Sequence, residues 1–168
     1  ISHVYKVRNS ETKEIAVAKV YNCTTLCHPG DDSFKQPFSY FQREVDIVYS
    51  LHHPNILPIL ELIEDNPTNS LILIMPFVEF GNLAEFLEAK KTSDDVNSVF
   101  NYIIICFYQM LEVLNYLHTM GIAHRNIMPD SIFVFNDHNY ALSHFRLIEK
   151  VQEKGSEVTL LTQVKGNP

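Results

Sequence analysis

The sequence predicts a mixed α+β protein in which a small strand-rich part is followed by a mainly helical part. Apolar residues alternate in a strand-like way through residues 4–8 and 15–21, and they recur at helical spacing from residue 99 to 117. The chain has 168 residues, of which 46% are hydrophobic and 20% charged. This composition excludes intrinsic disorder, and the length suffices for one domain with a buried core.

The first third of the chain predicts a hairpin, a loop and a helix. The two alternating runs flank a turn at residues 9–13, which is typical of an antiparallel pair of strands. Residues 22–37 are polar and without periodicity, which indicates a loop. We expect a helix from about Ser39 to His52, with Ser39 as its N-cap, because apolar residues fall on one face at three- or four-residue spacing. Pro54 ends it.

The middle of the chain predicts two more strands and a short helix. Strands are expected over residues 57–64 and 71–76, separated by a turn at residues 65–69. A short helix over residues 82–88 follows, and residues 90–97 indicate a polar linker.

The long helical pattern that follows predicts a mostly buried helix ending near Gly121. Polar residues interrupt it, so it lacks the unbroken apolar run that a bilayer span requires. Two short strands are expected at residues 132–135 and 140–142. Beyond Phe145 the chain is polar and aperiodic.

The charge balance argues against nucleic-acid and membrane partners. With 13 Lys+Arg against 20 Asp+Glu, the net charge is −7, which opposes an electrostatic grip on nucleic acid or on an anionic membrane. No signal peptide is apparent at the start, and the absence of an initiator Met suggests a fragment.

Cysteine usage indicates a reduced, cytoplasmic protein. There are three cysteines, and Cys106 lies inside the apolar helix. Cys23, Cys27 and His28 have a metal-like spacing. Since no second Cys/His pair follows at ligand spacing, a pair of loop cysteines is favoured over a zinc site.

Two charges occur among apolar residues. Lys19 lies on the apolar face of its strand, and Glu44 lies on the apolar face of the expected helix. A single buried ion costs several kcal/mol, so either both side chains reach solvent or they pair with one another or with a ligand.

Segments of the first half resemble protein kinases. Val17-Ala18-Lys19 resembles the strand that carries the kinase lysine, and Glu44 is placed like the glutamate of kinase helix C. The run His52-His53-Pro54-Asn55-Ile56 resembles the segment that follows that helix, and the run from Leu73 to Leu83 resembles a gatekeeper and hinge.

The second half continues the resemblance in the same order. The run from Tyr116 to Asn126 resembles the approach to a kinase catalytic loop, and the run from Ala141 to Arg146 stands where kinases have Asp-Phe-Gly. Gly166-Asn167-Pro168 resembles the motif before the substrate-site loop.

The resemblance implies a bilobal α+β kinase fold over the whole chain. Residues 1–78 would form the N-lobe and hinge, and residues 79–168 a partial C-lobe that ends in the activation segment. The glycine-rich loop would precede Val4 and is not in this sequence.

The positions that carry kinase chemistry depart from the family pattern. The catalytic Asp is replaced by Asn126, and an amide cannot act as general base near neutral pH. The metal-binding Asn is replaced by Ser131 and the metal-binding Asp by His144, with Arg146 two residues further on. Magnesium prefers oxygen ligands, so its binding is not expected.

These departures suggest a pseudokinase. The chain would act as an allosteric or scaffolding partner of another protein, such as an active kinase. The alternative is an ATP-dependent serine/threonine kinase that uses atypical residues.

The resemblance also indicates where ATP would bind, if it binds at all. Residues at nucleotide-contacting positions are Val4, Val17, Lys19, Glu44, Met75, Phe77, Val78 and Phe133. Val17 and Phe133 are larger than their kinase counterparts, which predicts a narrower adenine slot. Lys19 and Arg146 would cradle phosphates without metal. In the alternative, Arg146 is solvated or paired with Glu44.

One further set of kinase positions concerns shape rather than chemistry. His124 and Phe145 match two members of the apolar stack that joins the catalytic loop to helix C, and Val48 and Ile59 match the other two. The stack is complete in this sequence, so an active-like shape without chemistry is expected.

Overall fold

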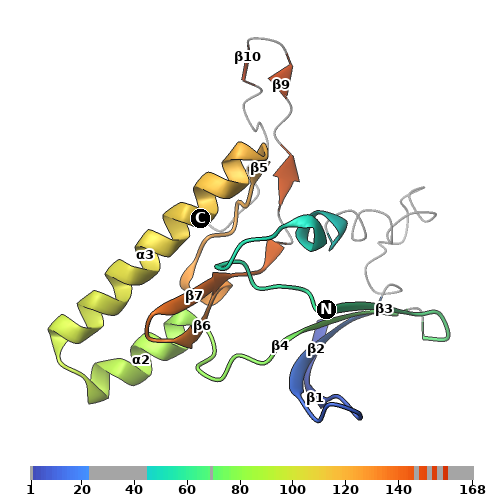
Figure 1. Ribbon diagram of the computed structural model, residues 1–168, viewed down its shortest axis with the longest axis horizontal. Helices are drawn as coiled ribbons and strands as arrows, with labels where there is room; N and C mark the ends of the chain where they lie inside the picture. Colours follow the sequence, from blue (N-terminus) through green and yellow to red (C-terminus); the bar gives the residue numbers. More distant parts are fainter. Residues whose placement is uncertain are drawn as a thin grey trace, which may run out of the picture. The chain divides into compact units, whose positions relative to one another are not determined.

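The chain folds into two units, which a computed structural model describes over residues 2–22, 45–68, 70–145, 148–150, 153–154 and 157–158. The first unit comprises Ile1–His52 and Leu57–Phe77, and the second comprises His53–Ile56 and Val78–Pro168. Figure 1 shows a sheet in the first unit and two long helices in the second.

The first unit is built on a four-stranded antiparallel sheet in the order β1-β2-β4-β3. Its strands are β1 (Ser2–Arg8), β2 (Ile15–Asn22), β3 (Glu61–Asp65) and β4 (Ser70–Pro76). The predicted hairpin is therefore confirmed as β1 and β2. In its turn, Asn9 Oδ1 accepts hydrogen bonds from the backbone N–H groups of Glu11 and Thr12, at 2.8 and 3.1 Å, which is typical of an Asx turn.

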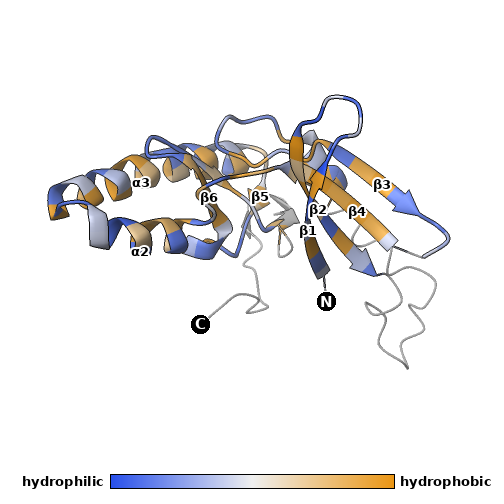
Figure 2. Cartoon of the chain, turned by 90° about the horizontal axis from the view of Figure 1, so that it is seen from below, coloured by the Kyte–Doolittle hydropathy of each residue, from blue (hydrophilic) through white to orange (hydrophobic). Residues whose placement is uncertain are grey.

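One face of this sheet carries the core of the first unit. Val45, from the helix over residues 45–50, packs with Leu71 and Leu73 of β4. Tyr21, Ile59 and Leu62, which are partly buried, pack against this cluster. Figure 2 shows hydrophobic residues recurring along β4, the central strand next to β2.

Two boundaries in the first unit differ from the sequence-based prediction. The helix ends at residue 50, and its expected first part, residues 39–44, lies outside the described residues. The strand expected from residue 57 begins only at Glu61. Pro58 lacks the N–H that a strand ladder requires, and Leu57 is buried as part of a loop.

The second unit contains the two long helices and short strand pairs. Its elements are α2 (Leu83–Ser93), α3 (Val96–Thr119), β5 (Ile122–Ala123), the 3₁₀ turn η3 (Pro129–Ser131), β6 (Ile132–Asn136), β7 (Asn139–Leu142), β8 (Glu149–Lys150), β9 (Glu153–Lys154) and β10 (Glu157–Val158). Strands β6 and β7 form the predicted hairpin. The pairing of β5 with β8 was not predicted, because two-residue strands leave no periodicity in a sequence.

The polar linker predicted over residues 90–97 is wrong, because α2 continues to Ser93 and α3 begins at Val96. A capping box starts α2: Asn82 accepts a hydrogen bond from the backbone of Glu85, whose side chain accepts one from the backbone of Asn82. Basic residues in the last turn favour its extension, since they complement the helix dipole.

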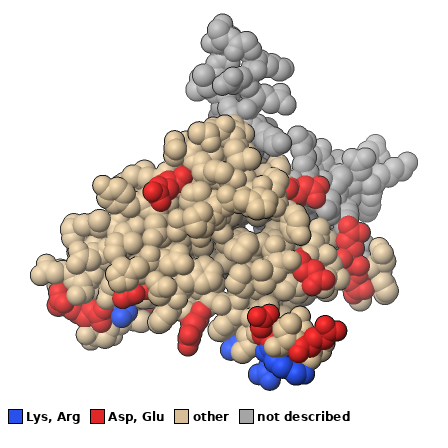
Figure 3. Space-filling view, viewed as in Figure 1, with Lys and Arg blue, Asp and Glu red and all other residues tan. Residues whose placement is uncertain are grey.

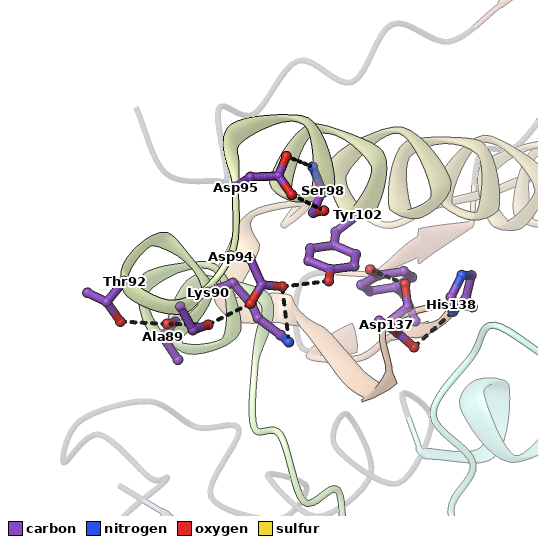
Figure 4. A network of polar contacts seen from close by, with 11 residues as sticks. Ala89, Lys90, Thr92, Asp94, Asp95, Ser98, Tyr102, Asp137 and His138 are labelled. Carbon is purple, nitrogen blue, oxygen red and sulfur yellow. Dashed lines mark hydrogen bonds and ion pairs between the residues drawn. The ribbon is translucent and has the colours of Figure 1, made fainter.

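A polar network fixes the corner between α2 and α3 (Figure 4). Asp94 accepts a hydrogen bond from the hydroxyl of Tyr102 at 2.7 Å and lies 3.3 Å from the ammonium of Lys90. The hydrogen bond from Tyr102 is the largest cause that lowers the pKa of Asp94. Asp95 caps α3 by accepting from the backbone N–H groups of Asn97 and Ser98. The polar run at residues 90–97 therefore forms a tight corner between α2 and α3 and is not a linker.

Helix α3 is not mostly buried, contrary to the sequence-based prediction. Only Cys106, Met110, Val113 and Leu117 are buried among its residues. The helix contacts β5, β7 and α2. Large apolar side chains on the rest of its surface are exposed: Val96, Phe100, Ile103, Ile104, Phe107, Tyr108 and Leu111. By length and composition alone α3 is also apolar enough to cross a membrane, a test that core helices of soluble proteins pass too.

Candidate functional site

Four of the predicted nucleotide positions share one face of the sheet in the first unit. Val4 is paired with Lys19 across β1 and β2, and Val17 is paired with Met75 across β2 and β4. Directly paired residues point to the same face, and so do residues two apart in a strand. The sheet therefore brings Val4, Val17, Lys19 and Met75 together on the face that also carries the core cluster.

Lys19 contacts an aromatic ring. Its Nζ lies 5.3 Å from the ring centroid of Tyr21. Within the described segments, no carboxylate forms an ion pair with Lys19. Glu44, one of the partners considered for Lys19, lies outside these segments, so nothing here tests their pairing.

A second contact between a lysine ammonium and an aromatic ring joins Lys6 and Phe77. The ammonium of Lys6 lies 4.1 Å from the centroid of the Phe77 ring, which is 37% exposed. Lys6 is paired with Val17 and so belongs to the same sheet face. The sequence reasoning missed Lys6, although its spacing of two residues from Val4 would have placed it on this face.

His124 follows β5 directly in the chain, and its side chain is buried. Its Nε2 lies 2.9 Å from the backbone oxygen of Ser143, and its Nδ1 accepts from the backbone N–H of Asn126 at 3.3 Å. A carbonyl only accepts, so Nε2 carries the proton and the ring is neutral. Burial lowers the pKa of His124 to about 4.

Two of the four residues of the predicted apolar stack, His124 and Phe145, lie in the second unit and are in contact. The rings of His124 and Phe145 meet edge to face with centroids 4.7 Å apart. Val48 and Ile59 belong to the first unit, where Val48 is buried and Ile59 packs against the Val45 cluster.

Asn126, which was predicted to stand at the position of the kinase catalytic aspartate, is engaged as a hydrogen-bond donor. Its Nδ2 donates to Ser131 Oγ across 3.3 Å. Ser131 has no exposed surface, and its backbone oxygen accepts from the N–H of Ser143 at 2.8 Å. Asn126, which is half-buried, and the buried Ser131 therefore form an uncharged pair.

His144 adopts a left-handed backbone conformation, with φ of 60°. Its ring meets that of Phe133 edge to face, with centroids 5.8 Å apart. Phe133 forms a bridge with Asn82, and Val78 is buried nearby in the chain. The structure thus brings together His144 and Phe133, while Arg146 lies outside the described residues.

The residues at the metal positions do not fit magnesium. The Ser131 hydroxyl is fully buried and accepts from the Asn126 amide, and His144 offers a nitrogen ligand. Magnesium requires hard oxygen ligands, usually carboxylates. In the described parts of the chain, no group of three or more His, Cys, Asp or Glu residues is arranged to hold a metal ion.

Comparison with known proteins identifies the family. The protein kinase domain model matches residues 1–168. The chain is 35% identical over 124 residues to the serine/threonine-protein kinase cds1 of Schizosaccharomyces pombe, which covers 74% of this chain and 25% of that protein. It is 34% identical over 108 residues to death-associated protein kinase 2 of Mus musculus, covering 64% of this chain and 27% of that protein.

These relatives are longer than this chain. The chain spans about a quarter of the length of each. The match of the domain model over the whole chain agrees with the small antiparallel sheet of the first unit and the helices of the second. The chain therefore belongs to the protein kinase superfamily and has a partial bilobal α+β kinase fold.

Proposed function

We propose that this chain is a catalytically impaired protein kinase domain that acts by binding another protein, as an allosteric or scaffolding partner in cytoplasmic signalling. The observation that carries the proposal is the hydrogen bond from Asn126 Nδ2 to Ser131 Oγ. In an active kinase a carboxylate at the position of Asn126 orients and deprotonates the substrate hydroxyl. An amide that donates to a buried serine has no basic lone pair for this task.

The residues around Asn126 support the same proposal. His144 stands at the position of the magnesium-binding aspartate, and Ser131 stands at that of the metal-binding asparagine. Three departures at one site remove the general base and both metal ligands. Losing the general base alone lowers a rate by roughly 10²- to 10⁴-fold.

Nucleotide binding without metal is part of the proposal. Lys19 is on the sheet face that carries Val4 and Val17, and its ammonium is a suitable donor for phosphate oxygens. The binding would be weak, because no described residue replaces the charge that magnesium supplies in kinases.

An active serine/threonine kinase is the second candidate. It is favoured by the retained Lys19 and by the names of the similar proteins, which are serine/threonine kinases. Asp130, the one acid close to Asn126 in the sequence, would have to act as base. It is exposed on the η3 turn.

Phosphate transfer from ATP in the presence of magnesium distinguishes the two. We expect no transfer to a generic protein substrate or to the chain itself above the level of the Lys19→Met variant. Sustained transfer that Lys19→Met abolishes would rule out the impaired domain. Thermal unfolding with ATP should show a small stabilisation that magnesium does not increase.

A further inference from the structure

The ring of Tyr21 faces the ammonium of Lys19. The two residues are separated by one position in β2, so their side chains point to the same face of the sheet. The distance of 5.3 Å from Lys19 Nζ to the ring centroid is within the range in which an aromatic ring attracts a cation. A ring carries no net charge, so the contact with Tyr21 leaves the positive charge of Lys19 available to an anion.

The Tyr21 ring is itself held in place. Tyr21 is paired with Leu71 across β2 and β4, and it packs against the cluster of Val45, Leu71 and Leu73. Both leucines are buried. Close packing restricts the rotamers of the ring, so the ring can serve as a fixed support for the flexible lysine.

We propose that Tyr21 is a positioning residue for nucleotide binding, because its ring holds the Lys19 ammonium on the sheet face where the phosphates of a nucleoside triphosphate bind without magnesium. This inference rests on the proposed nucleotide binding by Lys19. A free lysine side chain loses its rotamer freedom when it meets a phosphate, and a lysine that is already held loses less. Tyr21 thereby raises the affinity without touching the ligand.

Two substitutions at residue 21 separate the effect of the ring from that of its packing. Tyr21→Leu removes the ring and keeps an apolar side chain against the cluster, while Tyr21→Phe keeps the ring. Tyr5→Leu is the matched control. Tyr5 lies in the same hairpin, is 53% exposed and is paired with Ala18, so it points to the opposite face from Lys19. Tyr21→Met is a second ring-free variant, to be used if Tyr21→Leu does not fold.

The first measurement is calorimetric titration of the complete chain with ATP in the presence of a chelator. Tyr21→Leu should weaken binding about two- to fivefold, the range expected for the loss of one cation–π contact. Tyr21→Phe and Tyr5→Leu should bind like the unchanged chain. Equal affinity of Tyr21→Leu and the unchanged chain would overturn the role of Tyr21 and leave nucleotide binding intact.

The second measurement does not depend on nucleotide. In the carbon-detected NMR spectrum of a lysine-labelled chain, the ε-methylene of Lys19 should be shifted upfield by the Tyr21 ring, with Lys19→Arg giving the assignment. The shift should persist in Tyr21→Phe and vanish in Tyr21→Leu. An unshifted Lys19 signal in the unchanged chain would show that the Tyr21 ring does not hold the Lys19 ammonium. If the unchanged chain shows the shift but binds no ATP, the proposed nucleotide binding fails and the positioning role fails with it, while the impaired kinase fold stands.

Discussion

Gln109 of α3 and Asn55, which are far apart in the sequence, are joined by their side chains. Asn55 Nδ2 donates to Gln109 Oε1 at 2.8 Å and to the backbone oxygen of Tyr140 at the same distance. Gln109 Oε1 also accepts from the backbone N–H of Tyr140 at 2.9 Å, and its Nε2 donates to the backbone oxygen of His138 at 2.7 Å. Two amides thus satisfy both backbone groups of a buried β7 residue, which ties residues 53–56 to α3 and β7.

Replacing Gln109 with Leu should therefore destabilise the second unit. The change leaves the N–H of Tyr140, the oxygen of His138 and one hydrogen of Asn55 without their partner. Each unsatisfied group that is buried costs roughly 1–3 kcal/mol, so the free energy of unfolding should fall by about 2–4 kcal/mol. Urea-induced unfolding monitored by circular dichroism measures it.

Gln109→Glu is the control for this prediction. A glutamate keeps the acceptor for Asn55 and Tyr140 and replaces the donor to the exposed His138 oxygen with an acceptor. Its loss should be clearly smaller than that of Gln109→Leu. Equal losses for the two variants would show that the volume of the side chain matters and that its hydrogen bonds do not.

The neutral state of His124 predicts a dependence of stability on pH. Burial lowers its pKa to about 4, whereas an unfolded histidine titrates near 6.5. Between these values the unfolded chain binds a proton that the folded chain does not, so the free energy of unfolding rises with pH. Its contribution is complete above about pH 6.5 and is lost as the pH falls toward 4, with a full size on the order of 3 kcal/mol.

Urea unfolding at pH values from 4.5 to 7.5 tests this assignment. His124→Phe should flatten the rise of stability with pH, because no side chain is left to titrate at this position. The variant should also be less stable at pH 7.5, since the Ser143 oxygen loses its donor. A pH profile that keeps its slope in His124→Phe would locate the titrating group elsewhere.

Long periodic elements could be predicted from the sequence, and their ends and surroundings could not. The β1–β2 hairpin and α3 were predicted with nearly their observed bounds, because alternation and helical spacing persist over many residues. The α2–α3 corner was misread because its Lys, Ser and Asp residues look like a loop in composition. Their roles in capping and in the Tyr102 network become visible only when the two helices lie side by side (Figure 4).

In the candidate site, too, the order of the residues could be read from the sequence and their contacts could not. The roles of Asn126, Ser131 and His144 are predicted from their order in the chain, which needs no coordinates, and they stay predictions. The contacts of Lys6 with Phe77 and of Lys19 with Tyr21 depend on strand register and rotamers, and a sequence does not specify these. In Figure 3, basic residues gather beside acidic ones at the β1–β2 hairpin, a grouping that net charge alone conceals.

Magnesium binding should return only when a carboxylate replaces His144, and a carboxylate at Asn126 alone should not restore it. Asn126→Asp alone leaves His144 in place of an oxygen ligand, so ATP should stabilise this variant equally with and without magnesium. The double variant Asn126→Asp/His144→Asp supplies two carboxylates, and magnesium should then increase the thermal shift with ATP. Aspartate tolerates the left-handed backbone at residue 144, where φ is 60°.

Adding Ser131→Asn to this double variant should not improve it. Ser131 has no exposed surface, so a larger side chain overpacks its site at a cost of typically 1–3 kcal/mol. The triple variant should therefore melt below the double variant. A gain in magnesium-dependent stabilisation on adding Ser131→Asn would show that the site can open.

Replacing leucine with alanine should destabilise the protein strongly on the buried side of α3 and only slightly on its exposed side. Leu117 has no exposed surface, and Leu117→Ala removes buried methyl groups and leaves a cavity, so the free energy of unfolding should fall by about 2–5 kcal/mol. Leu111 is 47% exposed on the same helix, and Leu111→Ala should change the free energy of unfolding by less than about 1 kcal/mol.

The exposed side of α3 also carries Phe107 and Tyr108, and an exposed apolar patch of this kind favours self-association. Leu111→Ala combined with Phe107→Gln should therefore lower the apparent mass in concentrated solution, measured by light scattering, while Leu117→Ala should not. A loss for Leu111→Ala as large as that for Leu117→Ala would mean that the exposed side of α3 is covered in the folded protein.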